Sequence, residues 1–92
     1  MIKKIRHTGI VVRDLDISMH FYCDLLGFKI TRQLDESGVY VDNMLSLDQV
    51  RVATVKMTAP DGQMIELLKF HTHLNEQKPR DINNVGITHI AF

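Results

Sequence analysis

The chain has 92 residues, of which 45% are apolar and 24% are charged, a balance typical of a small globular domain. Its 11 basic and 11 acidic side chains cancel and are dispersed along the chain, so charge gives no support for a nucleic-acid partner. No apolar run approaches the roughly 20 residues that span a bilayer, and the basic amino terminus leads into a strand-like segment rather than an apolar signal region. We therefore expect no membrane partner and a cytoplasmic location. The single cysteine, Cys23, excludes an intrachain disulfide and is interpreted as a small apolar packing residue.

The first predicted elements are a strand and a helix. Residues 2–12 are rich in β-branched side chains and predict a strand, after which Asp14 is placed to cap a helix. Residues 15–26 carry apolar side chains that recur four, three and four positions apart, which is the stripe of an amphipathic helix. Gly27 supplies the left-handed residue on which such a helix commonly ends.

The next segments are expected to build the sheet. Residues 28–34 alternate loosely and predict a second strand, and residues 35–38 form a turn signal. Residues 39–47 leave two interpretations open, a short helix or an irregular crossing. Residues 50–57 predict a third strand with a strong apolar and β-branched pattern.

A hairpin and a tail complete the predicted order. Residues 59–62, Ala-Pro-Asp-Gly, are a strong turn signal, and residues 63–70 then pair back on the preceding strand. Residues 71–84 are polar and aperiodic and predict a linker, whereas residues 85–92 predict one more strand. The expected fold class is α+β, with one βαβββ module in residues 1–70 followed by the first strand of a second module.

Two short segments at opposite ends of the chain are similar. Residues 7–11 are His-Thr-Gly-Ile-Val and residues 89–92 are His-Ile-Ala-Phe. Each segment places a histidine in a predicted apolar strand. Their offset is 89 minus 7, or 82 residues, which is long enough for one whole βαβββ unit and its connector. The similarity predicts an internal repeat whose second copy is cut off.

Three titratable residues fall on the apolar sides of their predicted strands. Alternation groups His7, Glu66 and His89 each with apolar neighbours at positions two residues away. A buried carboxylate without a partner is costly, and a divalent cation held by carboxylate and imidazole would offset that cost. The three side chains together therefore predict a metal site with Glu66 as a candidate catalytic group.

Each of these residues also has a structural interpretation. His7 is explained equally by a core histidine bonded to backbone, Glu66 by a pair with Lys56 across the hairpin, and His89 by a position near a fraying chain end. The remaining titratable groups, among them Lys69 and the linker histidines, are interpreted as solvated surface residues.

The segment from His7 to Leu15, followed by Phe21-Tyr22 and Leu25-Leu26-Gly27-Phe28, resembles the opening of proteins of the vicinal oxygen chelate superfamily. Residues 64–68 resemble the segment that supplies the second metal ligand of these proteins, and residues 86–92 resemble the start of their second module. The resemblance implies paired βαβββ modules that form a cupped sheet around a divalent metal. It carries over His7, Glu66 and His89 as ligands and places a fourth at about position 148, which is 66 plus 82.

The resemblance implies a metal-dependent lyase or isomerase of the glyoxalase or epimerase type, in which an enolate is stabilised next to a metal-bound carbonyl oxygen. Glu66 is then the expected base, the ion is Zn, Ni, Co, Mn or Fe, and the substrate is a small carbonyl compound or thioester. Val11 stands where glutathione-dependent glyoxalases have an arginine that contacts glutathione, so the resemblance is closer to the epimerases.

The same superfamily leaves two alternatives open, a drug-sequestering protein without catalysis and a ring-cleaving dioxygenase. Dioxygenases generally take no ligand at the position of Glu66. Because one module leaves a sheet face and a sheet edge uncovered, a homodimer is expected, in which the terminal strand is exchanged or a second copy replaces the missing module.

Overall fold

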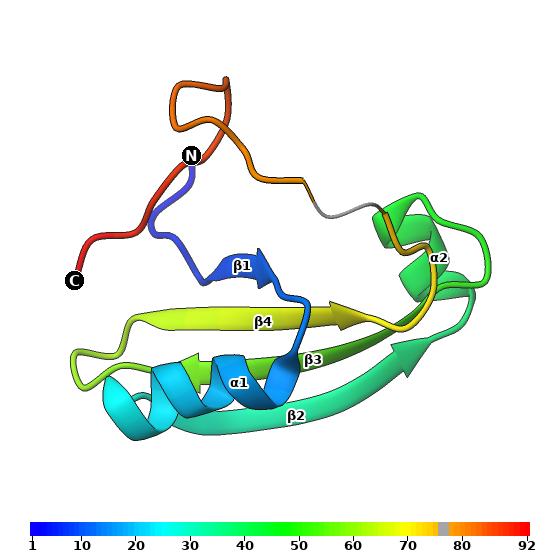
Figure 1. Ribbon diagram of the computed structural model, residues 1–92. Helices are drawn as coiled ribbons and strands as arrows, with labels where there is room; N and C mark the ends of the chain where they lie inside the picture. The colour runs from blue at the N-terminus through cyan, green and yellow to red at the C-terminus, as the bar shows by residue number, and fades with distance from the viewer. Residues whose placement is uncertain (76–77) are drawn as a thin grey trace.

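The computed structural model describes residues 1–75 and 78–92, and its elements form one mixed sheet with helices on it (Figure 1). In chain order the elements are β1 (Thr8–Val11), α1 (Leu15–Met19), the π-helical turn η1 (His20–Leu25), β2 (Lys29–Ser37), α2 (Val39–Leu45), β3 (Arg51–Thr58) and β4 (Met64–Phe70). The strand order across the sheet is β1-β4-β3-β2. β1 runs parallel to β4, whereas the other neighbours are antiparallel. The expected α+β class with a βαβββ module is confirmed.

The helical segment begins and ends as its sequence predicts. The Asp14 carboxylate accepts a hydrogen bond from the Ile17 N–H at 3.0 Å, which satisfies one of the free donors of the first turn. The segment continues through η1 and stops before Gly27, whose φ of 84° is readily adopted only by glycine. This helical unit therefore packs over one part of one face of the sheet (Figure 1).

The main core lies between this helical unit and the sheet. Val55, Met57 and Leu67 are each 0% exposed, and they pack with Phe28 and Ile65. Alternation along β3 and β4 directs these side chains to the helix-covered face. The module therefore depends on this layer for its stability.

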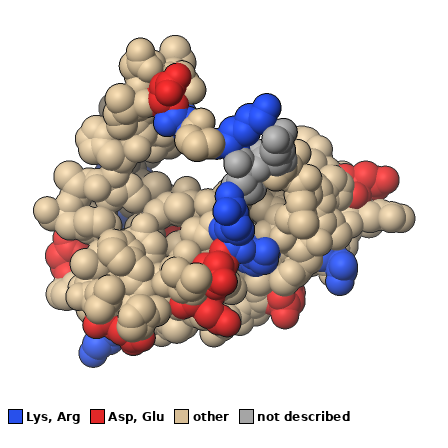
Figure 2. Space-filling model, viewed as in Figure 1, with Lys and Arg blue, Asp and Glu red and all other residues tan. Residues whose placement is uncertain are grey.

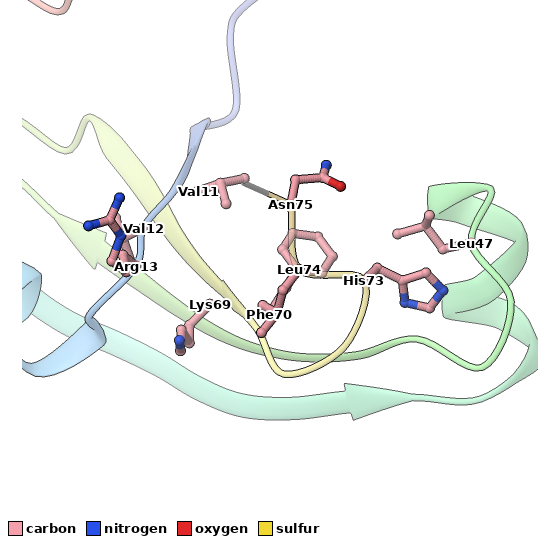
Figure 3. A pocket seen from close by; sticks show the side chains of 9 residues that line it. All are labelled: Val11, Val12, Arg13, Leu47, Lys69, Phe70, His73, Leu74 and Asn75. Carbon is pink, nitrogen blue, oxygen red and sulfur yellow. The ribbon is translucent and has the colours of Figure 1, made fainter. Parts of the chain in front are cut away.

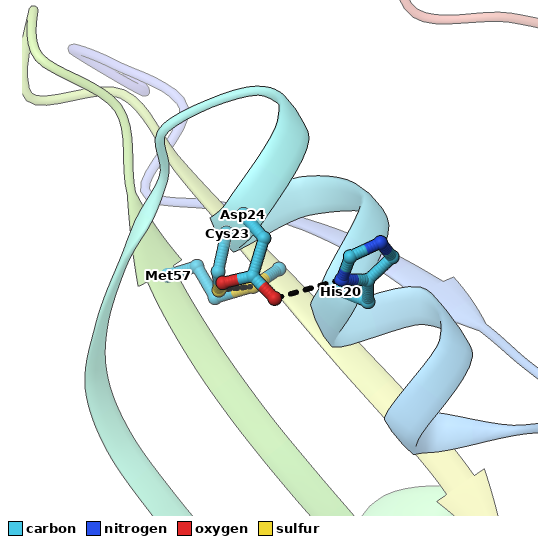
Figure 4. A network of polar contacts seen from close by, with 4 residues as sticks. All are labelled: His20, Cys23, Asp24 and Met57. Carbon is cyan, nitrogen blue, oxygen red and sulfur yellow. Dashed lines mark hydrogen bonds and ion pairs between the residues drawn. The ribbon is translucent and has the colours of Figure 1, made fainter.

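Cys23 joins the same layer from the helical side. Its Sγ lies 3.5 Å from the Sδ atom of Met57, and the neighbouring His20 and Asp24 form a surface pair at 2.8 Å (Figure 4). Burial raises the pKa of the Cys23 thiol, and the Asp24 carboxylate adds to the rise. Cys23 therefore stays a neutral packing group, as its sequence context indicates.

Of the two interpretations of residues 39–47, the short helix is the one observed, as α2 over Val39–Leu45. Val41 of α2 packs against Val50 and Val52 in a second, smaller cluster at the far end of the sheet. The Asp42 carboxylate accepts hydrogen bonds from the N–H groups of Gln49 and Val50 at 3.0 and 2.9 Å, which fixes the loop into β3. Local apolar burial and these hydrogen bonds to the following loop together stabilise the helix.

Two predicted boundaries are wrong because pairing across the sheet outweighs local sequence signals. The turn expected at residues 35–38 is part of β2 as far as Ser37, since Asp35 to Ser37 pair with Ala53 to Arg51 of β3. The strand expected at residues 2–12 begins only at Thr8, which pairs with Ile65. The chain before Thr8 runs away from the sheet and does not pair with β4 (Figure 1).

The strand expected at residues 85–92 is also not formed. These residues have no regular secondary structure and pair with none of the four strands of the described sheet. Instead the Phe92 ring packs on Tyr22 and Phe28, with ring centroids 6.4 and 6.0 Å apart. The end of the chain therefore folds back onto the aromatic edge of the helical layer.

The surface carries charges of both signs. On the face shown in Figure 2, basic and acidic side chains are intermixed. In the described part of the chain, no helix has the length and apolarity to span a bilayer.

Candidate functional site

The second face of the sheet carries the candidate site. Gly9 of β1 pairs with Glu66 of β4, and Glu66 pairs in turn with Lys56 of β3, so the three residues form one row across the sheet. Directly paired residues point to the same face, and this face is opposite the one that buries Met57 and Leu67. The helical unit of α1 and η1 leaves it uncovered, and α2 packs only at its far end (Figure 1). The row therefore lies on the open face.

His7 and Glu66 lie close together on this face. The Nε2 atom of His7 is 3.7 Å from Oε1 of Glu66, and the two side chains are 28% and 16% exposed. The other ring nitrogen of His7, Nδ1, is buried and has no hydrogen-bond partner among the described residues. Since a buried polar atom without a partner costs free energy, the surroundings of His7 are incomplete in the single chain.

Lys56 approaches the same carboxylate from the other side. Its Nζ atom is 3.9 Å from Oε2 of Glu66, and its side chain is 22% exposed. Glu66 therefore directs one oxygen toward the imidazole of His7 and the other toward an ammonium group. The cross-hairpin pair that the sequence offers as an alternative is present, and it coexists with the contact to His7.

His89 does not join this pair. It is exposed, and its Nδ1 atom lies 2.9 Å from the hydroxyl of Thr88. Within residues 1–75 and 78–92, no group of three or more histidine, cysteine or acidic residues is arranged to hold an ion. The structure thus brings together two of the three ligands expected from the sequence, and His89 lacks the strand that would position it.

The donor set of His7 and Glu66 fits one side of a divalent-metal site. Imidazole nitrogen and carboxylate oxygen suit first-row divalent ions, and two ligands of one such ion lie about 3 Å apart. The observed 3.7 Å needs only a small adjustment of either side chain. Because zinc sites take at least three protein ligands, this pair fits as half of a donor set rather than as a complete one.

These features define a structural class of protein, a βαβββ module whose open face presents an imidazole and a carboxylate. A family profile described as the Glyoxalase/Bleomycin resistance protein/Dioxygenase superfamily matches residues 4–92. The chain therefore belongs to this superfamily, as the resemblance to vicinal oxygen chelate proteins predicts.

Solved structures show the same fold. The chain is similar to a glyoxalase family protein from Bacillus cereus, with a TM-score of 0.84 and 24% identity over 95% of this chain and 60% of that one. It is also similar to the protein SMU.1112c, with a TM-score of 0.52 and 18% identity over 100% of this chain and 61% of that one. The chain thus spans about 60% of the length of these neighbours. The comparison with curated proteins gives no match.

Proposed function

We propose that this chain contributes half of the active site of a metal-dependent lyase or isomerase of the glyoxalase or epimerase type. The observation that carries the proposal is the 3.7 Å contact of His7 and Glu66 on the open face of a superfamily module. Oε1 of Glu66, mostly buried, faces Nε2 of His7, and Lys56 compensates the carboxylate only from the side of Oε2. A divalent cation between Nε2 of His7 and Oε1 of Glu66 would add a second compensating charge, and it would leave the buried Nδ1 of His7 still in need of a partner.

In this proposal each side chain has a separate task. When bound, a divalent ion supplies Lewis acidity that stabilises negative charge developing on a carbonyl oxygen of the substrate. His7 and Glu66 would hold that ion, through the imidazole and the carboxylate that face each other. Glu66 is also the candidate base, because a carboxylate oxygen on the open face is able to accept a proton from the carbon next to the carbonyl group. The substrate class is accordingly a small carbonyl compound or thioester.

The proposal includes a second copy of the chain. β1 is an edge strand of the sheet, and several apolar side chains on or beside the open face are exposed, among them Ile5 at 76% and Val11 at 63%. A two-fold pair of modules would cover these residues and bring a second His7 and a second Glu66 to the first pair, giving four donors. Residues 85–92, which form no strand here, are the segment that we propose is exchanged through the linker at residues 71–84.

Lys56 gives a prediction about metal affinity. Because its ammonium group lies beside the carboxylate that would bind the cation, Lys56→Met is expected to raise the affinity for Co²⁺ by about tenfold, which corresponds to about 1.4 kcal/mol. Isothermal titration calorimetry measures the change. Lys29→Met, at the start of β2, is the matched control and should leave the affinity as it is. If the Lys56→Met variant binds Co²⁺ with the affinity of the parent chain, Lys56 does not influence the metal site.

The ion pair of Lys56 and Glu66 favours a second candidate function, the binding of a small molecule without catalysis. The ammonium group of Lys56 compensates the negative charge of the Glu66 carboxylate without any metal, which is the arrangement expected of a superfamily member that only binds a ligand. The two functions differ in metal content: the enzyme requires a stoichiometric divalent ion, whereas the binding protein takes up its ligand equally well after treatment with a chelator.

A further inference from the structure

The outer edge of β2 is an uncovered strand edge. β2 is the last strand in the order β1-β4-β3-β2, and in the described chain no other element lies along its outer side (Figure 1). After the irregularity between Ile30 and Arg32, β2 pairs regularly with β3 as far as Ser37. Such an edge presents a row of backbone N–H and C=O groups that are able to pair with a strand of another chain.

This edge lies away from the other surfaces of interest. His7 and Glu66 lie on the β1 side of the sheet, and so does a cavity of about 560 Å³ whose wall includes Val11 and Phe70 (Figure 3). No described residue that lines this cavity comes from β2. Because β1 and β2 are opposite edges of one sheet, a partner on β2 leaves the candidate metal site free. A contact along β2 is therefore independent of the proposed metal chemistry.

Two opposite charges on β2 lack a partner. Arg32 and Glu36 lie four residues apart, so alternation directs both to the open face at a separation of about 13 Å. In the described chain neither side chain forms an ion pair. Arg32 is also paired directly with Lys56 of β3, and like charges at directly paired positions destabilise a sheet. A carboxylate placed on the outer side of Arg32 would therefore relieve this repulsion.

The segment from Arg32 to Glu36 is complementary to itself when two copies run antiparallel. With Leu34 opposite Leu34 of the partner subunit, Arg32 faces Glu36 of the partner subunit. Gln33 then faces Asp35 of the partner subunit, so that an amide meets a carboxylate. A two-fold axis at Leu34 repeats both contacts, and Leu34, which is 37% exposed, is covered between them. Every charged side chain of the segment then has a complementary group opposite it.

Other registers of the same pair are unfavourable. A shift by one residue would set the open face of one chain against the helix-covered face of the other. Centring the pair on Asp35 brings two carboxylates together, and centring it on Arg32 brings two guanidinium groups together. Centring it on Gln33 sets Arg32 opposite Leu34 and leaves the positive charge unpaired. Charged side chains on an edge commonly prevent pairing, but here the order of their signs selects one antiparallel register.

We propose that two copies of this chain associate through β2, antiparallel and centred on Leu34, and join their four-stranded sheets into one. The backbone groups of the two edges supply the hydrogen bonds, and the two ion pairs of Arg32 with Glu36 fix the register. Because few residues take part, the contact belongs with small, transient interfaces, and we expect a dissociation constant of roughly 100 μM. Chains at low micromolar concentration therefore separate at β2.

Charge reversal tests this contact. Arg32→Glu and Glu36→Arg each set like charges opposite one another at both ends of the pair. Each is expected to weaken association at least about tenfold, as measured by sedimentation velocity of the full chain up to about 1 mM. In an equimolar mixture of the two variants every such contact joins opposite charges again, so association should return to at least the parent level. The double variant Arg32→Glu/Glu36→Arg is the matched control and should associate like the parent chain.

Hydrogen–deuterium exchange locates the contact. The peptide that covers residues 29–37 is expected to exchange more slowly at about 1 mM than at about 10 μM in the parent chain, and at the same rate in either single variant. Association through β1 is common to all samples, because the reversed charges lie at the opposite edge of the sheet. A parent chain that does not associate through residues 29–37 at about 1 mM, single variants that associate like the parent, or a mixture that does not recover would each overturn the proposal.

Discussion

Replacing Glu66 with glutamine is expected to lower the affinity for Co²⁺ at least about a hundredfold, or about 2.7 kcal/mol, and to abolish turnover. The substitution keeps the size of the side chain but removes the negative charge that faces His7 and the group proposed to accept the proton. Calorimetric titration with Co²⁺ measures the loss of binding. The NMR spectrum should stay that of the folded chain, because Glu66 lies on the open face outside the main core.

A matched control for this substitution lies on β2, the edge strand opposite β1. Glu36 of β2 is partly buried and pairs with Val52, well away from His7 along the strands. Glu36→Gln is expected to bind Co²⁺ like the parent chain. If Glu66→Gln also binds Co²⁺ like the parent, Glu66 is not a ligand and its contact with Lys56 is its whole role.

The second large effect concerns stability. Leu67 is 0% exposed at the centre of the layer between the helical unit and the sheet, so Leu67→Ala is expected to lower the free energy of unfolding by about 3 kcal/mol. That is a large fraction of the 5–15 kcal/mol typical of a domain. Urea unfolding followed by circular dichroism measures it.

Leu25→Ala provides the comparison, since Leu25 is 65% exposed and its truncation should change stability by less than about 0.5 kcal/mol. Equal losses for the two variants would contradict the assignment of the core to the helix-covered face.

The elements that the sequence predicts correctly are those defined by contacts near in the chain. The Asp14 cap, the apolar stripe and Gly27 together delimit the helical segment, because each acts within a few residues of the next. The hairpin is equally local: the Gly62 N–H donates to the carbonyl oxygen of Ala59 at 2.9 Å. Given that turn, alternation alone places Lys56 opposite Glu66, which is where the structure has it.

The features that the sequence does not predict depend on partners far away in the chain. Asp35 carries a turn signal but pairs with Ala53 of β3. The sequence around Asp35 does not predict how far β3 extends, so it does not predict where β2 ends. Residues 85–92 have the pattern of a strand but pair with no strand of the described sheet, and His89 is exposed. The proximity of His7 and Glu66 rests on the parallel pairing of β1 with β4, which no turn signal encodes. The cavity beside Phe70 requires the return of the chain after β4 and has no sequence signature.

The central claim is that His7 and Glu66 form half of a metal site that a second chain completes. Native mass spectrometry of the purified chain with Co²⁺ tests it most directly, because one spectrum reports both the assembly and its metal content. We expect a dimer that carries one ion, and we expect His7→Ala to lose the ion. A chain that remains a metal-free monomer, or a His7→Ala variant that retains the ion, would contradict the claim.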